Sequence, residues 1–594
     1  MSTATAVEPS ARAEFRVEGA PTYDRRGPRR WVLSHLARHP ALLGGFAVGL
    51  LGASVLNSTV ARLTGVVFDE VVGGLDLGRL TTLALIVLGA VLVRGALDLG
   101  ASFAVETLAQ RIERDAREEL YLSLLGKSQT FHERQRVGDV MARATNDVRQ
   151  LHGMMNPGVA LIGDSLLGLI VPIVFVALLD PPLLLAPLAF VVAFAFALVR
   201  YTRELNPVTA GQRRAFGELN AGLNETIEGI EVVKSAAQEP AERARFTANA
   251  RRYRDQFVRQ GLVQARYLPL LLVSAAFAGA FAHGLVRVAD GAITSGELVA
   301  YLGLVGLLRF PAFISIFTFS LVELGLAGAR RMLELMRTDT ELDENPSGHA
   351  APIRGAIEFQ DVTFAYGGQA GREGLQGVSF RVEPGQTVAI VGTTGSGKST
   401  LTKLVNRVYD ATSGRVLVDG VDVRDWNLAS LRSQMSVIEQ DVFLFARSVE
   451  ENVAFGLEGA THEAVVEAAR AAQALEFVER LPEGFGTVIG ERGTTLSGGQ
   501  RQRLAIARAL LVDPRVLVLD DATSAVDSAT EDAIQRAIHA VLQGRTTLLI
   551  THRLAQIRKA DRVILLDRGR VVDQGSHLEL LERSAAYQRI FGRS

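Results

Sequence analysis

The sequence predicts an α-helical polytopic membrane domain followed by a separate α/β domain. Hydrophobic residues make up 48% of the 594 residues and the mean hydropathy is +0.20, which is high for a chain with 21% charged residues. The apolar residues gather in long runs in the first half, whereas the second half alternates short Val/Ile-rich stretches with amphipathic ones. Between the halves, "TDTELDENPSGHAAP" (338–352) is polar and contains Pro and Gly, which is typical of a linker.

Six segments of the first half are candidate transmembrane helices, because a spanning helix needs about 20 mainly apolar residues. Long polar connectors with helical periodicity follow the second and fourth segments, so we expect these helices to extend into the cytoplasm and turn there. The basic N-terminus and the Arg-rich connectors place this side in the cytoplasm. The six segments are 41–66, 79–104, 156–178, 182–200, 264–288 and 297–325.

These features divide the chain into four parts. A cytoplasmic N-terminal segment (1–40) lacks the apolar core and cleavage site of a signal peptide. The six-helix domain occupies 41–330, the linker 331–354 and the α/β domain 355–594.

Overall composition excludes several functions. The 63 Lys and Arg residues nearly balance the 64 Asp and Glu residues, so no polyanionic partner is indicated. The absence of cysteine excludes disulfides, thiolate metal sites and cysteine nucleophiles. The balanced charge and the membrane spans argue against a nucleic acid partner.

Five ionisable residues fall in or near the apolar segments, where charges are costly and usually face a bundle interior or a water-filled cavity. We expect Asp98, His283 and Glu323 to lie near helix ends, and Asp164 and Arg309 to be the better candidates for lining a cavity.

The second half contains a phosphate-binding motif. "IVGTTGSGKST" (390–400) fits G-x-x-x-x-G-K-[ST], follows a strand-like run and opens a helix-like one, which is the context that this motif requires. Glycines let backbone N–H groups surround phosphate oxygens, Lys398 would reach the β and γ phosphates, and the Ser399 hydroxyl would bind Mg²⁺. The candidate phosphate-binding residues are Thr394, Gly395, Ser396, Gly397, Lys398, Ser399 and Thr400.

Two further motifs follow. "LSGGQRQRLAIARALL" places Ser497, Gly498 and Gly499 before an amphipathic helix, whose first backbone amides favour an anion. "VLVLDDATSAVD" is a buried strand that ends in two acids, and Asp520 at its carboxyl end is a candidate Mg²⁺ ligand.

The order of these motifs resembles that of the ATP-binding cassette (ABC) transporters, and the resemblance covers essentially the whole chain. It implies an exporter-type half-transporter in which a six-helix membrane domain is fused to one α/β P-loop nucleotide-binding domain. It also implies ATP and Mg²⁺ as ligands, and a multi-pass location in the cell membrane with the nucleotide-binding domain in the cytoplasm.

The resemblance assigns roles to matching positions. Tyr366 in "VTFAYGG" corresponds to the aromatic residue that stacks on adenine, and Gln440 in "VIEQD" to the glutamine that senses Mg²⁺. Asp527 matches a loop that communicates across the dimer, and His552 in "LLITHRL" matches the histidine that contacts the γ-phosphate. The "RVGDVMARATNDVRQL" stretch resembles a coupling loop.

In this family two cassettes pair head to tail, so a chain with one cassette must dimerise. The signature of one chain, here Ser497, Gly498, Gly499 and Gln500, then completes the site of the other. The residue after the Mg²⁺ aspartate is generally a catalytic glutamate, but here it is Asp521. A carboxylate retracted by about 1 Å can cost about 100-fold in rate. Asp521 beside an intact "LSGGQ" resembles the slow-site subunit of a heterodimeric exporter; a slow homodimer is the alternative.

The expected function is therefore ATP-driven export of an amphipathic or hydrophobic compound, such as a drug-like molecule or lipid, by a dimer with a second half-transporter. A peptide cargo and import of a siderophore-like molecule fit the same architecture. An ATP-gated channel or a regulatory membrane subunit is the alternative from another functional class.

Overall fold

The computed structural model describes residues 12–17, 19–74, 76–266, 269–366, 373–520 and 528–592. The chain forms two compact units. One, here called the membrane unit, comprises Pro21–Tyr121 and Gly138–Arg337; the other, the cassette unit, comprises Met1–Ala20, Leu122–Val137 and Thr338–Ser594.

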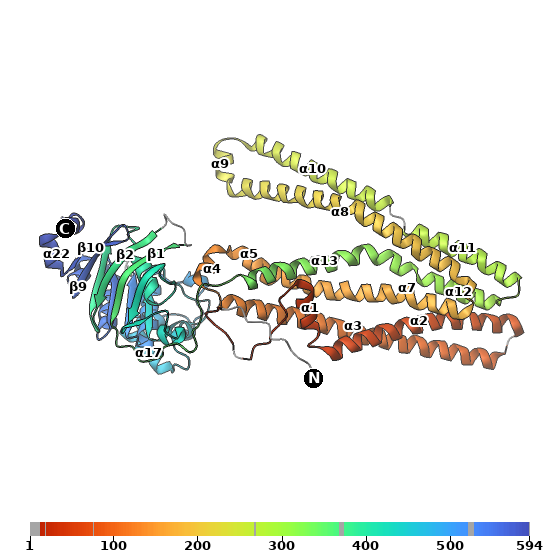
Figure 1. Cartoon of the computed structure of the whole chain (residues 1–594), viewed down its shortest axis with the longest axis horizontal. Helices are drawn as coiled ribbons and strands as arrows, with labels where there is room; N and C mark the ends of the chain where they lie inside the picture. The colour runs from red at the N-terminus through yellow and green to blue at the C-terminus, as the bar shows by residue number, and fades with distance from the viewer. Residues whose placement is uncertain are drawn as a thin grey trace. The chain divides into compact units, whose positions relative to one another are not determined.

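The membrane unit is all helical (Figure 1). Among the residues that the structure describes, six helical segments of this unit are long and apolar enough to cross a membrane, which confirms the expected number of spans. Its helices are α1 (Pro28–Leu36), α2 (Pro40–Gly74), α3 (Leu77–Leu125, whose last turn belongs to the cassette unit), α5 (Val137–Ala142), α6 (Val148–Gly153), α7 (Ala160–Leu179), α8 (Leu185–Glu228), α9 (Ile230–Ser235), α10 (Glu239–Arg266), α11 (Pro269–Ala289), α12 (Ser295–Leu307) and α13 (Arg309–Arg337).

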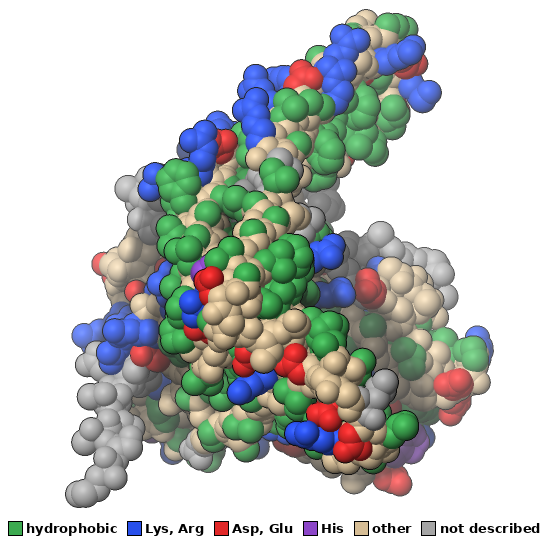
Figure 2. All heavy atoms as spheres, turned by 90° about the vertical axis from the view of Figure 1, so that its right-hand side faces the viewer, with side chains coloured by type: hydrophobic (Ala, Val, Ile, Leu, Met, Phe, Trp, Pro, Cys, Tyr) green, Lys and Arg blue, Asp and Glu red, His purple; other side chains and the backbone are tan. Residues whose placement is uncertain are grey.

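The expected cytoplasmic extensions are long helices. Helices α8 and α10 run side by side as a hairpin closed by α9 (Figure 1). Figure 2 shows apolar side chains along the lower part of this projecting arm and Lys and Arg side chains along its upper part, as expected for a helix pair that leaves the membrane on its cytoplasmic side.

Two boundaries differ from the expectation. The sixth span, expected as one helix over 297–325, is interrupted at Leu308. Pro311 explains the break, because a proline ring clashes with the carbonyl four residues earlier, here that of Leu307. In addition, α13 continues to Arg337, so residues 331–337 of the expected linker are helical.

Close backbone contact holds α12 against α2. A Cβ added at Gly65 would lie 2.2 Å from the Gly296 carbonyl oxygen, and one at Gly296 would lie 2.1 Å from that of Gly65. The Gly296 N–H also donates to Asp69 Oδ1 at 2.6 Å. Small residues at such contacts let membrane helices approach closely, which substitutes for the hydrophobic driving force that lipid does not supply.

The described part of the cassette unit contains two sheets. A six-stranded sheet has the order β10-β9-β3-β8-β7-β6, and a four-stranded antiparallel sheet has the order β2-β1-β4-β5. The strands are β1 (Ile357–Ala365), β2 (Glu373–Val382), β3 (Thr387–Gly392), β4 (Ser413–Val418), β5 (Val421–Asp422), β6 (Met435–Ile438), β7 (Val516–Asp520), β8 (Thr546–Ile550), β9 (Arg562–Asp567) and β10 (Arg570–Gly575).

The helices of this unit are α4 (Gln129–Arg134), α14 (Lys398–Val405), α15 (Leu428–Arg432), α16 (Val449–Val453), α17 (His462–Ala471), α18 (Leu475–Glu479), α19 (Gly498–Val512), α20 (Ser528–Leu542), α21 (Leu554–Ile557), α22 (His577–Arg583) and α23 (Ala585–Phe591). Alternating strand residues divide the core. Val518 packs into one cluster with the four-stranded sheet and α14, whereas Leu517 and Leu519 pack into a second cluster with α19.

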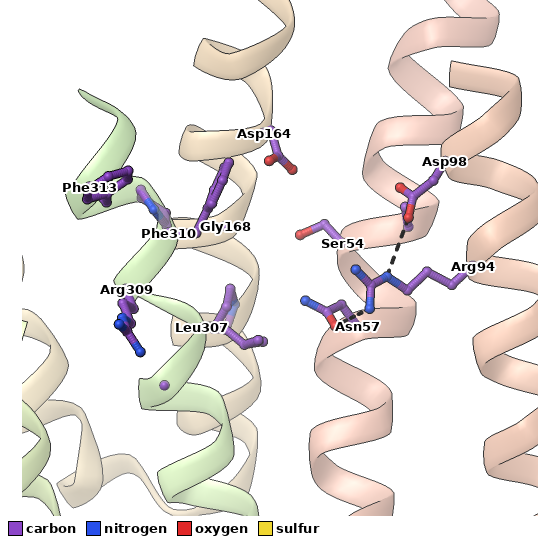
Figure 3. Close-up of a pocket in the computed structure, with 14 residues that line it drawn as sticks. Ser54, Asn57, Arg94, Asp98, Asp164, Gly168, Leu307, Arg309, Phe310 and Phe313 are labelled. Carbon is purple, nitrogen blue, oxygen red and sulfur yellow. Dashed lines mark hydrogen bonds and ion pairs between the residues drawn. The ribbon is translucent and has the colours of Figure 1, made fainter. Parts of the chain in front are cut away.

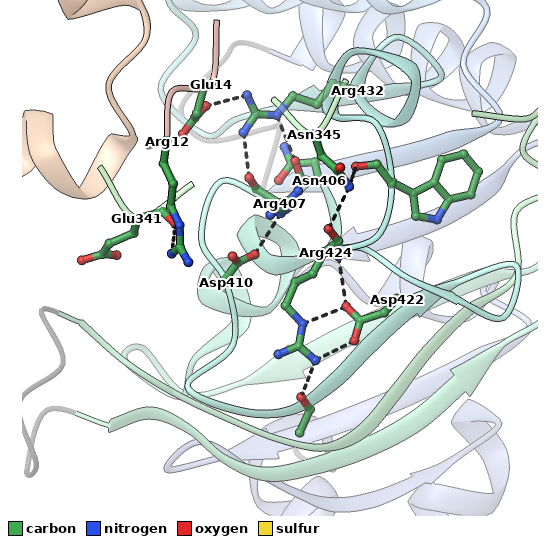
Figure 4. Close-up of polar contacts among 12 residues, drawn as sticks. Arg12, Glu14, Glu341, Asn345, Asn406, Arg407, Asp410, Asp422, Arg424 and Arg432 are labelled. Carbon is green, nitrogen blue, oxygen red and sulfur yellow. Dashed lines mark hydrogen bonds and ion pairs between the residues drawn. The ribbon is translucent and has the colours of Figure 1, made fainter. Parts of the chain in front are cut away.

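The N-terminal segment is anchored within the cassette unit (Figure 4). Arg432 Nη1 donates to Glu14 Oε2 at 2.8 Å, and the Glu344 N–H donates to the Ala13 carbonyl at 2.7 Å. The Glu14 N–H donates to the carbonyl of Gly126 at 2.9 Å, so residues 13 and 14 bridge the end of α3 and the cassette.

Candidate nucleotide-binding site

The loop between β3 and α14 has the tightly turned backbone that a phosphate-binding loop requires. Gly392 (φ +156°) and Gly397 (φ +101°) adopt conformations that favour glycine. A Cβ at Gly392 would lie 2.1 Å from the Leu566 carbonyl oxygen, and one at Gly397 would lie 2.4 Å from that of Gly374. Neither position tolerates a side chain, so the loop keeps its tight path at the N-terminus of α14.

Polar groups of this loop fit an anion. The Ser396 hydroxyl is buried and has no hydrogen-bond partner among the described residues. Lys398 Nζ donates to the carbonyls of Gly392 at 3.0 Å and Thr393 at 2.9 Å, which folds the ammonium group over the loop. Ser399 and Thr400 follow in the first turn of α14. These donors and the helix N-terminus match the chemistry of a phosphate chain.

Four neighbouring parallel strands place the other predicted residues at the same sheet edge. In the order β3-β8-β7-β6, Ile390 is in register with Ile550, Ile550 with Asp520, and Leu519 with Ile438. Because all four strands run the same way, the residues that follow them emerge at one edge, where open α/β sheets bind ligands. The structure thus brings together Lys398 after β3, His552 after β8, Asp520 at the end of β7 and Gln440 after β6.

Tyr366 lies beside the phosphate loop. Its hydroxyl is 2.9 Å from Thr400 Oγ1, and its ring meets Phe364 edge-on with centroids 4.9 Å apart. Tyr409 lies on another side, with a centroid distance of 5.6 Å. This places the tyrosine next to the first turn of α14.

The signature residues are ordered but belong to the other side of the sheet. Ser497 caps α19: its hydroxyl accepts from the Gln500 N–H at 3.3 Å, while Gln500 Oε1 accepts from the Ser497 N–H at 2.8 Å. Gly498 and Gly499 form the first turn. Because α19 and α14 pack on opposite faces of the six-stranded sheet, a chain does not bring its own signature over its own phosphate loop.

Asp521 and Asp527 lie outside the described residues. Their roles therefore stay sequence-based predictions.

The structure also identifies a contact that the sequence analysis missed. Within the cassette unit, the Tyr409 hydroxyl donates a short hydrogen bond to Glu133 of α4. Burial raises the pKa of Tyr409, and the Glu133 carboxylate raises it further, so the phenol stays a donor at neutral pH. Tyr409 in turn contacts Tyr366. No motif marks α4 or Tyr409, and only the helix-capping position of Ser128 hints at a short helix.

The stretch expected to couple the domains, 136–151, forms α5, a π-helical turn and part of α6. Within the membrane unit it packs on α13, where Arg331 Nη2 donates to Asp147 Oδ1 at 2.6 Å. Its coupling role stays a prediction. Within the cassette unit, α4 and the residues beside it contact Thr340, Glu341 and Tyr409.

Comparison with known proteins agrees with these features. Residues 375–524 match a family model described as ABC transporter, and residues 43–312 match one described as ABC transporter transmembrane region. An ATP-dependent lipid A-core flippase from Aromatoleum aromaticum is 36% identical over 564 residues, covering 92% of this chain and 93% of that protein. A putative multidrug export ATP-binding/permease protein, YgaD, from Bacillus subtilis is 33% identical over 559 residues, covering 92% and 95%.

A solved structure has the same fold. The structure of a bacterial Atm1-family ABC exporter with ATP bound superimposes with a TM-score of 0.78 at 30% identity, covering 94% of this chain and 98% of that one.

The phosphate loop, the strand-end residues and the six spanning helices define an ATPase coupled to transport across a membrane. The chain belongs to the ABC transporter family and has the architecture of an exporter half-transporter. It is a multi-pass membrane protein with a cytoplasmic nucleotide-binding domain, and ABC exporters of this kind work as dimers.

Proposed function

We propose that this chain exports amphipathic or hydrophobic compounds as the slow-site half of a heterodimeric ABC exporter. The observation that carries the heterodimer is the pair Asp520–Asp521 beside an intact signature, Ser497 to Gln500. Relatives named as lipid A-core flippases and as a putative multidrug exporter favour a lipid or drug-like cargo. The partner is a second half-transporter with glutamate at the position of Asp521.

The residues of the site then have distinct roles. Tyr366 stacks on adenine, while the loop amides from Thr394 to Thr400 and the Lys398 ammonium bind the phosphates. Ser399, Asp520 and Gln440 would hold Mg²⁺, which when bound neutralises charge on the phosphate oxygens.

His552, which follows β8, contacts the γ-phosphate. Asp521 positions the attacking water poorly, because its carboxylate is one methylene shorter than that of glutamate. The signature of this chain, with Asp527, serves the partner's faster site.

Asp521 also favours a second candidate, an ATP-gated channel that binds nucleotide without pumping. Flux measurements in vesicles separate the two. An exporter accumulates cargo against a gradient with ATP and stops with a non-hydrolysable analogue. A channel only dissipates a gradient, and it continues to do so with the analogue.

The hydrogen bond between Tyr409 and Glu133 of α4 supports a coupling role for these two residues. We expect Tyr409→Phe to leave ATP hydrolysis within about twofold of wild type but to lower ATP-driven transport about tenfold. The reason is that a hydrogen bond to a charged group contributes about 1.5–3 kcal/mol. Hydrolysis and cargo flux measured on the same proteoliposomes check this.

Glu133→Gln should reproduce the defect, and the double variant should be no worse than either single one, because both remove the same hydrogen bond. Tyr587→Phe, at a buried tyrosine in another cluster of the same unit, is the matched control. Transport that falls only in proportion to hydrolysis would refute the coupling role.

A further inference from the structure

A cavity of about 650 Å³ lies inside the membrane unit, between α2, α3, α7, α12 and α13 (Figure 3). Its size is in the range of small-molecule sites, about 300–1,000 Å³. Asp164 and Arg309 line it, which confirms their expected place. Asp98 lines it as well, and so does not lie near a helix end as expected, because α3 continues far past the apolar run to Leu125.

One wall of the cavity is internally neutral. Arg94 Nε lies 3.5 Å from Asp98 Oδ2 one turn along α3, and Arg94 Nη1 donates to Asn57 Oδ1 on α2 at 2.8 Å. Figure 3 shows these two contacts side by side. This positive charge and this negative charge therefore satisfy each other without a ligand.

The other two charges have no such partner. Asp164 on α7 and Arg309 on α13 make no hydrogen bond or ion pair with any described residue, although both line the cavity. Figure 3 shows Asp164 projecting from α7 toward the wall that carries Arg94 and Asp98. Unpaired ionisable groups at membrane depth are expensive and mark substrate or ion pathways.

Most of the remaining lining is apolar. It includes Leu307 at the end of α12 and Phe310 and Phe313 of α13, together with two prolines and the polar Ser54. The cavity thus offers one carboxylate and one guanidinium that lack an ion-pair partner among the described residues, together with a mostly apolar surface. A ligand complementary to all three is an amphiphile with an amine and an anionic group in the same head.

We infer that this cavity recognises a zwitterionic amphiphile, whose amine pairs with Asp164 and whose phosphate or carboxylate pairs with Arg309. This assigns the cargo class and therefore rests on the proposed export function. Guanidinium binds phosphate through two parallel hydrogen bonds, whereas a single carboxylate suits an ammonium group. The chemistry excludes purely apolar cargo as the preferred ligand, since such a compound would leave both charges unpaired.

Direct binding tests this separately from transport. The full-length protein in an uncharged maltoside detergent is titrated with radiolabelled phosphatidylethanolamine, with phosphatidylglycerol of the same tails, and with a long-chain alkylamine. We expect phosphatidylethanolamine to bind at least about tenfold tighter than either ligand that lacks one charge. Soluble phosphoethanolamine, which has no tails, should not compete at equal concentration.

Substitutions identify the two recognition points. Asp164→Asn should lower the affinity for phosphatidylethanolamine to that for phosphatidylglycerol. Arg309→Gln should lower it to the affinity for the alkylamine. Asp164→Glu should keep the preference, which separates loss of charge from loss of folding. Glu323→Gln, which removes an acid of the same domain that does not line the cavity, is the matched control.

Each outcome is decisive. The inference is overturned if the wild type binds the three ligands equally, or if phosphoethanolamine competes fully. It is also overturned if Asp164→Asn and Arg309→Gln both keep the wild-type preference. Selective binding without ATP-driven movement of the lipid in proteoliposomes leaves the inference standing and refutes the export function instead.

Discussion

Lys398→Ala is expected to lower the ATP hydrolysis of the chain purified alone at least about 100-fold. Its ammonium group is folded over the loop between β3 and α14, where it donates to the carbonyls of Gly392 and Thr393. A preorganised donor aimed at the charge that develops during phosphoryl transfer typically contributes about 100- to 1,000-fold in rate. Steady-state phosphate release from the purified protein in lipid measures the effect.

Lys559→Ala is the matched control, because it removes an exposed lysine of the same unit away from the phosphate loop. Lys398→Arg should not rescue, since a branched guanidinium does not fit between tightly turned glycines. Retention of more than a tenth of the wild-type activity in Lys398→Ala would contradict the assignment of this loop to the phosphates.

Asp521→Glu is expected to raise the ATP hydrolysis of the chain purified alone by about 100-fold. The added methylene advances the carboxylate by about 1 Å toward the water that a general base must reach within about 2.6–3.2 Å. Asp520, one residue earlier, keeps its place at the end of β7. The same phosphate-release assay, run on both proteins at saturating ATP, gives the ratio.

Asp425→Glu adds the same methylene at an exposed position of the cassette unit and should change nothing. A wild type that already hydrolyses ATP as fast as the Asp521→Glu variant would show that aspartate is a competent base here. The slow-site assignment would then be wrong.

Motifs with a fixed backbone requirement were the most predictable part of the structure. Gly392 and Gly397 have the conformations that only the expected loop demands, and the run from Val516 to Asp520 forms a strand that ends at the expected sheet edge. Six apolar segments gave six spanning helices because length and hydropathy are nearly sufficient conditions in a membrane.

Features decided by contacts distant in sequence were not predictable. The break at Leu308 is different, because it follows from the nearby Pro311 and so had a local signal in the sequence. Helix α4 was missed because its contact with Tyr409 pairs residues far apart in the chain, with no local pattern to mark either one. Asp98 was misplaced because hydropathy shows where the apolar run ends but not that α3 continues beyond it to Leu125.

The position of Gln440, Asp520 and His552 at one edge of the sheet shows how sequence motifs and sheet topology combine. Each residue was found by its motif, but only the strand order β8-β7-β6 and its register put them next to each other. A motif therefore names the residue, and the sheet topology makes it part of a site.

Native mass spectrometry of the transporter purified from its own membrane through a tag on this chain tests the central claim most directly. The account predicts a complex of this chain with one different ABC half-transporter, whose sequence has glutamate at the position equivalent to Asp521. A complex with twice the mass of this chain, together with ATP hydrolysis that Asp521→Glu does not raise, would contradict it.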